Sequence, residues 1–179
     1  MTDEEILNLL AKKQHAERGF RLLMEKYQER LYWHIRRMVT NHEDANDVVQ
    51  NCFIKVFRNV HKFQRKSALY TWLYRIATNE AITFINRRKR RKATSIDSED
   101  SILARQLKAD VYFDGEEIQL KLQCALDTLP KKQHLVFNMR YFEEMTYKQM
   151  SEVSGTSVGA LKASYHHAVK KIELFLKAE

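Results

Sequence analysis

Apolar residues recur every three to four positions along most of the chain, the spacing that places side chains on one face of an α-helix. One such stripe runs from Phe20 to Met38, a second from Val49 to Val60, and a third from Leu69 to Phe84. With 4 Gly and 1 Pro in 179 residues, few positions would interrupt a helix. The pattern predicts an all-α fold, with Phe57 among the apolar residues of the second stripe.

Polar residues mark where these helices are expected to begin. Thr2 and Glu5 have the spacing of a capping box ahead of the first apolar positions. Asn41 and Ser67 are candidate N-caps for the helices that carry the second and third stripes. The four helices predicted over residues 1–92 would pack together as one bundle-like domain.

A polar, acidic stretch follows at residues 93–115, and its weak periodicity predicts a flexible linker. The helical pattern resumes at Glu116, and Pro130 suits the first turn of the next helix. We therefore expect two small helical domains, residues 1–92 and 116–179, joined by a flexible acidic linker.

The second domain carries a helix-turn-helix pattern. Thr146 and Gln149 form another candidate capping box, which opens a short helix. Gly155 follows in the turn, where it can adopt a positive φ without steric cost. Ser157 then caps a longer helix whose inward stripe runs from Val158 to Ile172. A short helix, a glycine turn and a second amphipathic helix are typical of DNA-reading modules.

The outward face of the longer helix combines small residues with hydrogen-bond donors that can reach bases or phosphates. Its members are Gly159, Lys162, Ala163, His166, His167 and Lys170. The alternative is an ordinary helical hairpin of an all-α protein. A metal site is not expected, because adjacent histidines diverge by about 100° around a helix.

The helix predicted after Ser67 begins with aromatic residues and ends in six consecutive cations, Arg87–Lys92. Helical spacing places Trp72, Arg75, Asn79 and Asn86 on one flank. Such side chains can stack on, neutralise and hydrogen-bond a displaced nucleotide, and the cations can follow its phosphates. The alternative interpretation buries Tyr70, Trp72 and Tyr74 in the core and leaves the basic run in solvent.

Charge is distributed unevenly along the chain. The net charge of +8 comprises +10 over residues 1–92, −5 over 93–117 and +3 over 118–179. This distribution favours two polyanion-binding modules over an accidentally skewed surface. It also permits the acidic linker to pack on the basic domains as self-inhibition.

No apolar run approaches the roughly 20 residues that span a bilayer. No signal-peptide pattern opens the chain, so we expect a cytoplasmic protein. Cys52 and Cys124 lack a CxxC partner and are expected to be small buried residues.

Four segments together resemble the bacterial extracytoplasmic-function sigma factors. Glu43–Phe57 resembles that family's polymerase-binding helix, and Phe63–Asn79 its promoter-melting segment. Ala125–Gln133 and Tyr141–Lys171 resemble its second DNA-binding domain. These motifs occur in the family's order with the expected linker between them.

The resemblance implies three contact surfaces. The first domain would dock on the clamp helices of the polymerase β′ subunit through Asp44, Asp47, Gln50 and Asn51. It would also open the minus-ten element and capture a flipped base, using Asn59, Phe63, Tyr70, Trp72, Arg75, Ile76, Asn79, Arg87 and Arg88. The second domain would contact the β flap and read the minus-thirty-five element with Ser157, Gly159, Lys162, Ala163, His166, His167 and Lys170.

The chain departs from the family pattern in two respects. Position 51 is Asn where the family commonly has Glu, a surface change with a mild expected effect. Ser164, His166 and His167 stand where many members carry Arg, so the family's promoter preferences do not transfer to this chain.

The sequence thus predicts a transcription initiation factor without catalytic activity, because no active-site pattern or metal-ligand spacing is found. No cofactor is expected. The expected partners are core RNA polymerase, promoter DNA and an anti-sigma factor, with a monomer in the free state. Two other interpretations stay open. One is a free-standing helix-turn-helix regulator, and the other is a sigma mimic that sequesters a regulator.

Overall fold

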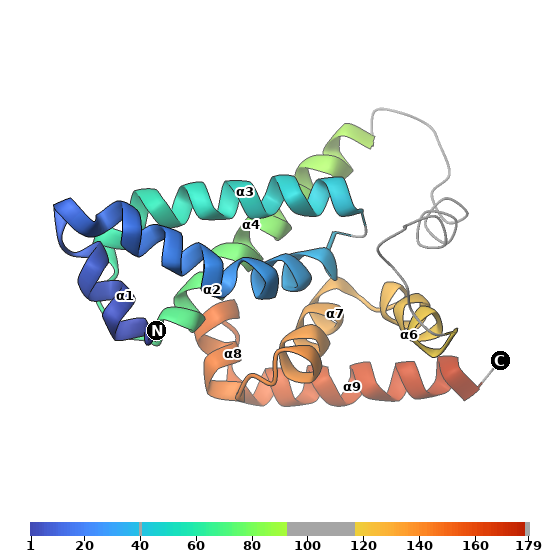
Figure 1. The fold of residues 1–179 in the computed structure, drawn as a ribbon. Helices are drawn as coiled ribbons and strands as arrows, with labels where there is room; N and C mark the ends of the chain where they lie inside the picture. Colours follow the sequence, from blue (N-terminus) through green and yellow to red (C-terminus); the bar gives the residue numbers. More distant parts are fainter. Residues whose placement is uncertain (40, 93–116, 178–179) are drawn as a thin grey trace.

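The computed structural model describes residues 1–39, 41–92 and 117–177 (Figure 1). Within these ranges the regular elements are helices and no strand occurs, so the predicted all-α class is confirmed. None of the described helices is both long and apolar enough to cross a membrane. The predicted linker at 93–115, and its predicted packing on the basic domains, fall outside the described residues.

Helices of two halves make up the fold. The N-terminal half contains α1 (Asp3–Leu10), α2 (Ala16–Arg36), α3 (His42–Asn59) and α4 (Leu69–Lys92), with 3₁₀ turns at Lys13–His15 and Val60–Lys62. The C-terminal half contains α6 (Glu117–Asp127), α7 (Lys131–Phe137), a π-helical turn (Asn138–Phe142), α8 (Tyr147–Ser154) and α9 (Val158–Lys177).

Two of the three caps predicted in the N-terminal half are confirmed. The Glu5 amide donates to Thr2 Oγ1 and the Thr2 amide donates to the Glu5 carboxylate, which completes the capping box. Asn41 Oδ1 accepts from the Glu43 amide at 2.8 Å. The third prediction is wrong by one residue. The Ala68 carbonyl already accepts the first helical bond, from the Trp72 amide, so the N-cap position is Ala68 and not Ser67.

The apolar stripes of the N-terminal half pack into one core. The α3 helix lies against both α2 and α4 (Figure 1). Leu23, Leu31 and Leu73 are fully buried there. Cys52 is buried in the same core as predicted, whereas Cys124 is only half-buried, and both are free thiols.

The helix-turn-helix pattern of the C-terminal half is confirmed in its local details. Gln149 and Thr146 form the reciprocal capping box, and Gly155 has the positive φ of 69°. The Ala160 amide donates to Ser157 Oγ at the start of α9. One inward position is wrong. Val158 is 39% exposed because it lies in the first turn of α9, beyond the reach of the core.

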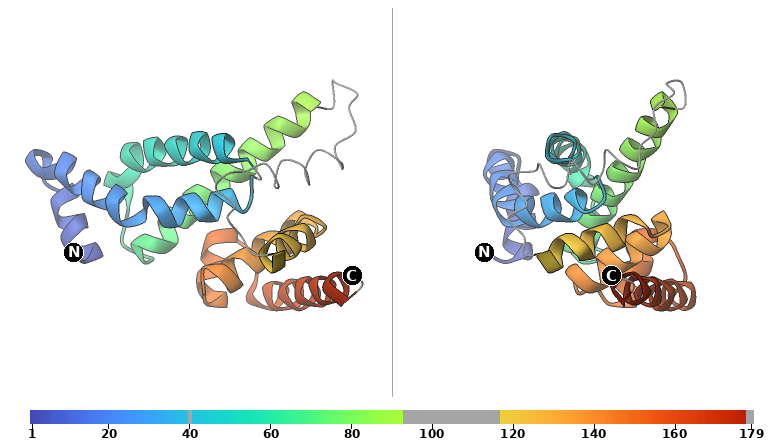
Figure 2. Two further views of the ribbon diagram at one scale, coloured as in Figure 1. Left: turned by 45° about the vertical axis from the view of Figure 1, so that its right-hand side comes forward. Right: turned by 90° about the vertical axis from the view of Figure 1, so that its right-hand side faces the viewer.

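The two halves are in contact through α8, which packs against α4 (Figures 1 and 2). Met139, Met145 and Met150 of the C-terminal half belong to the same buried cluster as Leu23 and Leu73. A second, smaller cluster stays within the C-terminal half. The described halves therefore share apolar core surface.

Candidate functional site

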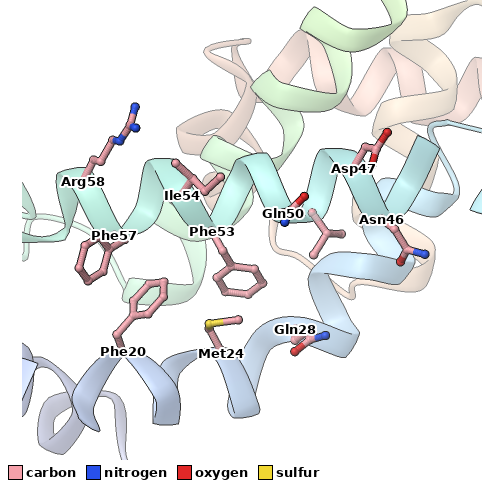
Figure 3. A pocket seen from close by; sticks show the side chains of 11 residues that line it. Phe20, Met24, Gln28, Asn46, Asp47, Gln50, Phe53, Ile54, Phe57 and Arg58 are labelled. Atoms are coloured by element: carbon pink, nitrogen blue, oxygen red, sulfur yellow. The ribbon is translucent and has the colours of Figure 1, made fainter. Parts of the chain in front are cut away.

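An apolar groove lies open between α2 and α3 (Figure 3). It has a volume of about 950 Å³. Phe20 and Met24 of α2 face Phe53 and Phe57 of α3 across it. The remaining lining residues are Gln28, Asn46, Asp47, Val49, Gln50, Ile54 and Arg58.

Large apolar side chains are left accessible at this groove. Phe57 is 57% exposed although its ring packs edge-on against Phe20, with 4.9 Å between the centroids. Ile54 is 43% exposed. The inward face predicted for Phe57 is therefore only partly correct, because the core-facing row of α3 is formed by Val48, Cys52 and Val56. A clustered, accessible apolar surface is typical of an interaction site.

Only two of the four predicted polymerase-binding residues line this groove. Asp47 and Gln50 line the groove. Asn51 is exposed on α3 but is not part of the lining. Asp44 instead forms an ion pair with Arg88 of α4. The apolar floor was not predicted, although Ile54 was a sequence signal for it, because it is a large apolar residue outside the predicted inward stripe of this helix.

A second hollow, of about 470 Å³, lies where the 3₁₀ turn after α3 leads into α4. It brings together three predicted minus-ten residues, Phe63, Trp72 and Arg75, and the two rings lie 5.2 Å apart. The rest of the lining is Lys62, Gln64, Lys66, Ser67, Thr71 and Glu152. An aromatic wall with a cationic rim can bind a flat, anionic ligand such as an unpaired nucleotide.

Thr71 is a feature of this hollow that sequence reasoning missed. It is 2% exposed, and its buried hydroxyl has no hydrogen-bond partner in the described chain. A buried polar group without a partner is costly, and a ligand in the hollow would supply one. The sequence signal was a threonine between the aromatic residues Tyr70 and Trp72.

Other predicted minus-ten residues lie outside the lining. Asn59 donates to the Lys55 carbonyl at 2.8 Å, Ile76 is half-buried and Asn79 is exposed on α4. Tyr70 is half-buried, and burial raises its pKa to about 12. The alternative of an aromatic core is realised only at Tyr74, which is fully buried.

The basic end of α4 is partly engaged within the chain. Arg87, Lys89, Arg90 and Arg91 are exposed, whereas Arg88 is held by Asp44. Asn86, expected on the nucleotide-binding flank, accepts from Lys131 Nζ at 3.3 Å. The accessible cations are therefore those on either side of the ion pair.

The outward face predicted for α9 is exposed along its whole length. All seven predicted minus-thirty-five residues, Ser157, Gly159, Lys162, Ala163, His166, His167 and Lys170, are accessible. A side chain built at Gly159 would meet no atom within 4 Å, so a ligand can approach the backbone closely there. This face can lie against a duplex.

The sequence matches known families over both halves. Residues 23–91 match the family described as Sigma-70 region 2, and residues 119–172 match Sigma-70, region 4. One similar protein is the RNA polymerase sigma-H factor of Pseudomonas aeruginosa, which is 31% identical over 99% of this chain and 96% of that protein. Another is the ECF RNA polymerase sigma-E factor of Escherichia coli K12, which is 27% identical over 97% of this chain and 93% of that protein.

Two solved structures share the fold. The sigma factor RpoE in complex with the anti-sigma factor NepR from Bartonella quintana has a TM-score of 0.72 and 19% identity, over 89% of this chain and 98% of that chain. CnrH in complex with the cytosolic domain of CnrY has a TM-score of 0.72 and 21% identity, over 99% and 98% of the two chains.

Proposed function

The chain belongs to the sigma-70 family, in its extracytoplasmic-function group, and we propose that three surfaces on it direct RNA polymerase to promoters. The observation that carries this proposal is the succession of region 2 and region 4 along one chain, each with an accessible surface of suitable chemistry. The match over residues 23–91 also disfavours a free-standing helix-turn-helix regulator. We place the two regions at residues 1–92 and 116–179, with the linker at 93–115.

The groove between α2 and α3 is the proposed docking site for the clamp helices of the polymerase β′ subunit. Its apolar floor suits the apolar face of a partner helix, which is a common mode of recognition. Asp47 and Gln50 would supply polar contacts at the lining. Asn51 would lie at the edge of the contact, and Asp44 would act by holding Arg88.

The hollow around Phe63 and Trp72 is the proposed site of minus-ten recognition. Stacking of an unpaired base on an aromatic ring contributes about 1–3 kcal/mol, which offsets part of the cost of opening the duplex. Arg75 and the neighbouring lysines would neutralise phosphates, and the Thr71 hydroxyl would hydrogen-bond the captured base. Asn79 and Arg87 would contact the strand further along α4.

The exposed face of α9 is the proposed reader of the minus-thirty-five element. Lys162, His166 and His167 can donate to base edges or phosphates, and Gly159 and Ala163 allow close approach. Because the face has no Arg, it lacks the bidentate arginine–guanine contact. We expect weak binding by this half alone and reliance on the β flap of the polymerase.

Control by an anti-sigma factor is also part of the proposal. Both structures named above are complexes in which a related fold is bound to an anti-sigma factor or to the cytosolic domain of a second protein. The chain itself would perform no catalysis, because the polymerase supplies the nucleotidyl-transfer chemistry.

The direct test is transcription in vitro with purified core polymerase and genomic DNA fragments. We expect promoter-specific initiation that requires the chain. If the chain neither binds core polymerase nor produces specific transcripts, the proposed function is wrong.

Replacing Phe57 by Ser tests the docking groove. We expect affinity for core polymerase to fall at least about tenfold, because aromatic residues at interface centres contribute most of the binding energy. The matched control is Trp33→Ser, which removes a 36% exposed aromatic ring of α2 outside the groove lining. Fluorescence anisotropy with labelled chain measures both. Equal losses in the two variants would contradict the assignment.

A further inference from the structure

One acidic residue of the C-terminal half is buried where that half contacts the N-terminal half. Glu143 follows the π-helical turn and precedes α8, and its side chain is 5% exposed. It is the one acidic residue among the buried positions of the described chain. A buried carboxylate needs partners, because its desolvation is costly otherwise.

The partners of Glu143 come from α4 and from the end of α2. Arg37 Nη1 donates to Oε1 at 2.9 Å, and the Tyr74 hydroxyl donates to Oε2. The Tyr70 hydroxyl donates to the Glu143 carbonyl at 3.2 Å. Arg37 also stacks over the Phe142 ring at 4.2 Å. These contacts join residues that lie 69 to 106 positions apart in the sequence.

Burial at this contact shifts the pKa values of the two residues that donate to the Glu143 carboxylate. Burial lowers the pKa of Arg37, and the Glu143 carboxylate opposes that effect. Burial and the same carboxylate raise the pKa of Tyr74. Arg37 and Tyr74 therefore rely on Glu143 to satisfy their polar groups where they are desolvated.

The same packing obstructs the second hollow. Glu152 of α8 contributes to its lining beside Trp72, Arg75 and Lys66. A carboxylate at a cationic rim occupies the region that an anionic nucleotide would need, and like charges repel. While α8 lies against α4, the hollow is therefore unsuited to a nucleic-acid strand.

We propose that Glu143 is an intramolecular latch that holds the C-terminal half against α4 and keeps the free chain in a closed state that excludes a nucleic-acid strand from the second hollow. The buried methionines supply contact area, and the latch selects this one alignment of the two halves. Release would expose Tyr70 and Tyr74 and remove Glu152 from the hollow. The exclusion of nucleic acid rests on the proposed role of the hollow, whereas the latch itself does not.

Hydrogen exchange of the full chain tests the latch directly. Glu143→Gln keeps the shape but removes the charge, and Glu144→Gln changes the adjacent exposed residue as a matched control. We expect exchange in peptides of α8 and of residues 69–76 to rise at least about tenfold in the Glu143 variant only. Exchange in the core of α3 should not change. Unchanged α8 exchange, or equal rises in all peptides, would overturn the proposal.

Arg37→Gln tests the latch from the side of the ion-pair partner of Glu143. Hydrogen exchange should rise in the same peptides as in the Glu143 variant. The double variant should exchange little faster than either single variant, because both changes break one contact. Additive effects would mean that the two residues act separately and that the latch is not a pair.

A single-stranded probe of about 20 thymidines, labelled with fluorescein, tests the exclusion, because stacking sites bind such strands with little sequence preference. We expect Glu143→Gln to bind it about fivefold or more tightly than the native chain. If hydrogen exchange shows that Glu143→Gln has released α8 but the variant binds the probe no more tightly than the native chain, the proposed exclusion of nucleic acid from the hollow is wrong. If the latch opens but no transcription occurs with core polymerase, the latch stands and the proposed function fails.

Discussion

His34 is one of the buried residues that set the response of this protein to acid. It is fully buried, its Nε2 lies 2.9 Å from Thr78 Oγ1, and its ring lies 4.8 Å from that of Tyr74. Burial, with a smaller effect of nearby Arg37, lowers its pKa to about 3. Burial also lowers the pKa of His134 to about 4. Both imidazoles are therefore neutral in the folded chain over most of the acidic range.

The sign of the pH dependence follows from these pKa values. Below an unfolded pKa of 6.5 the unfolded chain protonates both histidines and the folded chain does not, so the free energy of unfolding falls as pH falls. Asp127 acts oppositely, because burial raises its pKa from 3.8 to about 6 and the folded chain retains that proton. The effect of the two histidines exceeds that of the one carboxyl by one proton. Near pH 5 the free energy of unfolding therefore falls by about 1.4 kcal/mol for each unit by which the pH falls.

Replacing His34 by Gln should flatten this acid response. The expected change is a reduction of the slope near pH 5 by about 1.4 kcal/mol per pH unit, since one of the titrating groups is gone. Urea unfolding between pH 5 and 7.5 measures it. His15→Gln, at an exposed position, should leave the slope as it is. A variant with the native slope would show that His34 is not the group responsible.

At the scale of an element, α3 carries core residues on one side and lines the proposed docking groove on the adjoining side. Val48, Cys52 and Val56 are buried in the core. Phe53 lies at the boundary and is 4% exposed, whereas Phe57, one turn later, is 57% exposed in the groove. Two aromatic residues one turn apart therefore differ in environment: Phe53 is buried in the core and Phe57 is accessible in the groove.

Alanine substitutions on α3 should reveal this division. We expect Phe53→Ala to lower the free energy of unfolding by about 3–4 kcal/mol, because it removes a buried ring from the core. Phe57→Ala should cost less than about 1 kcal/mol, since most of its ring is already in water. Chemical denaturation measures both. Similar losses would mean that Phe57 is a core residue and that the groove is not a free surface.

At the scale of the whole molecule, the net charge of +8 favours association with nucleic acid, but the cations are not equivalent. Arg88 is held by Asp44, while Arg90 is exposed further along α4. An arginine that already has a carboxylate partner displaces fewer counterions from DNA than an accessible one. The ion pair therefore lowers the effective charge of the basic end of α4.

The salt dependence of DNA binding should distinguish the two arginines. For a duplex of about 30 base pairs, we expect Arg90→Gln to reduce the slope of log K against log salt concentration by about 0.9, as expected for one lost phosphate contact. Arg88→Gln should reduce it by less. Titrations at several salt concentrations measure both slopes. A larger reduction for Arg88 would show that its ion pair with Asp44 opens on binding.

Local features were predictable because they depend on residues a few positions apart. The capping boxes at Thr2 and Thr146, the positive φ of Gly155 and the exposed face of α9 all follow from short-range spacing. Two local predictions were wrong: the N-cap predicted at Ser67 lies one residue later, and Val158, predicted to face inward, is exposed. Both lie at helix ends, and the position of a helix end depends on how far the surrounding core extends. Of the candidate sites, the sequence identified Phe63, Trp72 and Arg75 of the hollow and Asp47 and Gln50 of the groove.

The sequence by itself determined the helices, their order, the helix-turn-helix and the family, since periodicity, caps and motif succession are written along the chain. Only the tertiary structure decided that Phe57 opens into a groove, that Asp44 holds Arg88 and that Glu143 enters the N-terminal half. These features depend on which surfaces meet across long separations. A helical pattern states which face of a helix is apolar, but not which neighbour, if any, will cover that face.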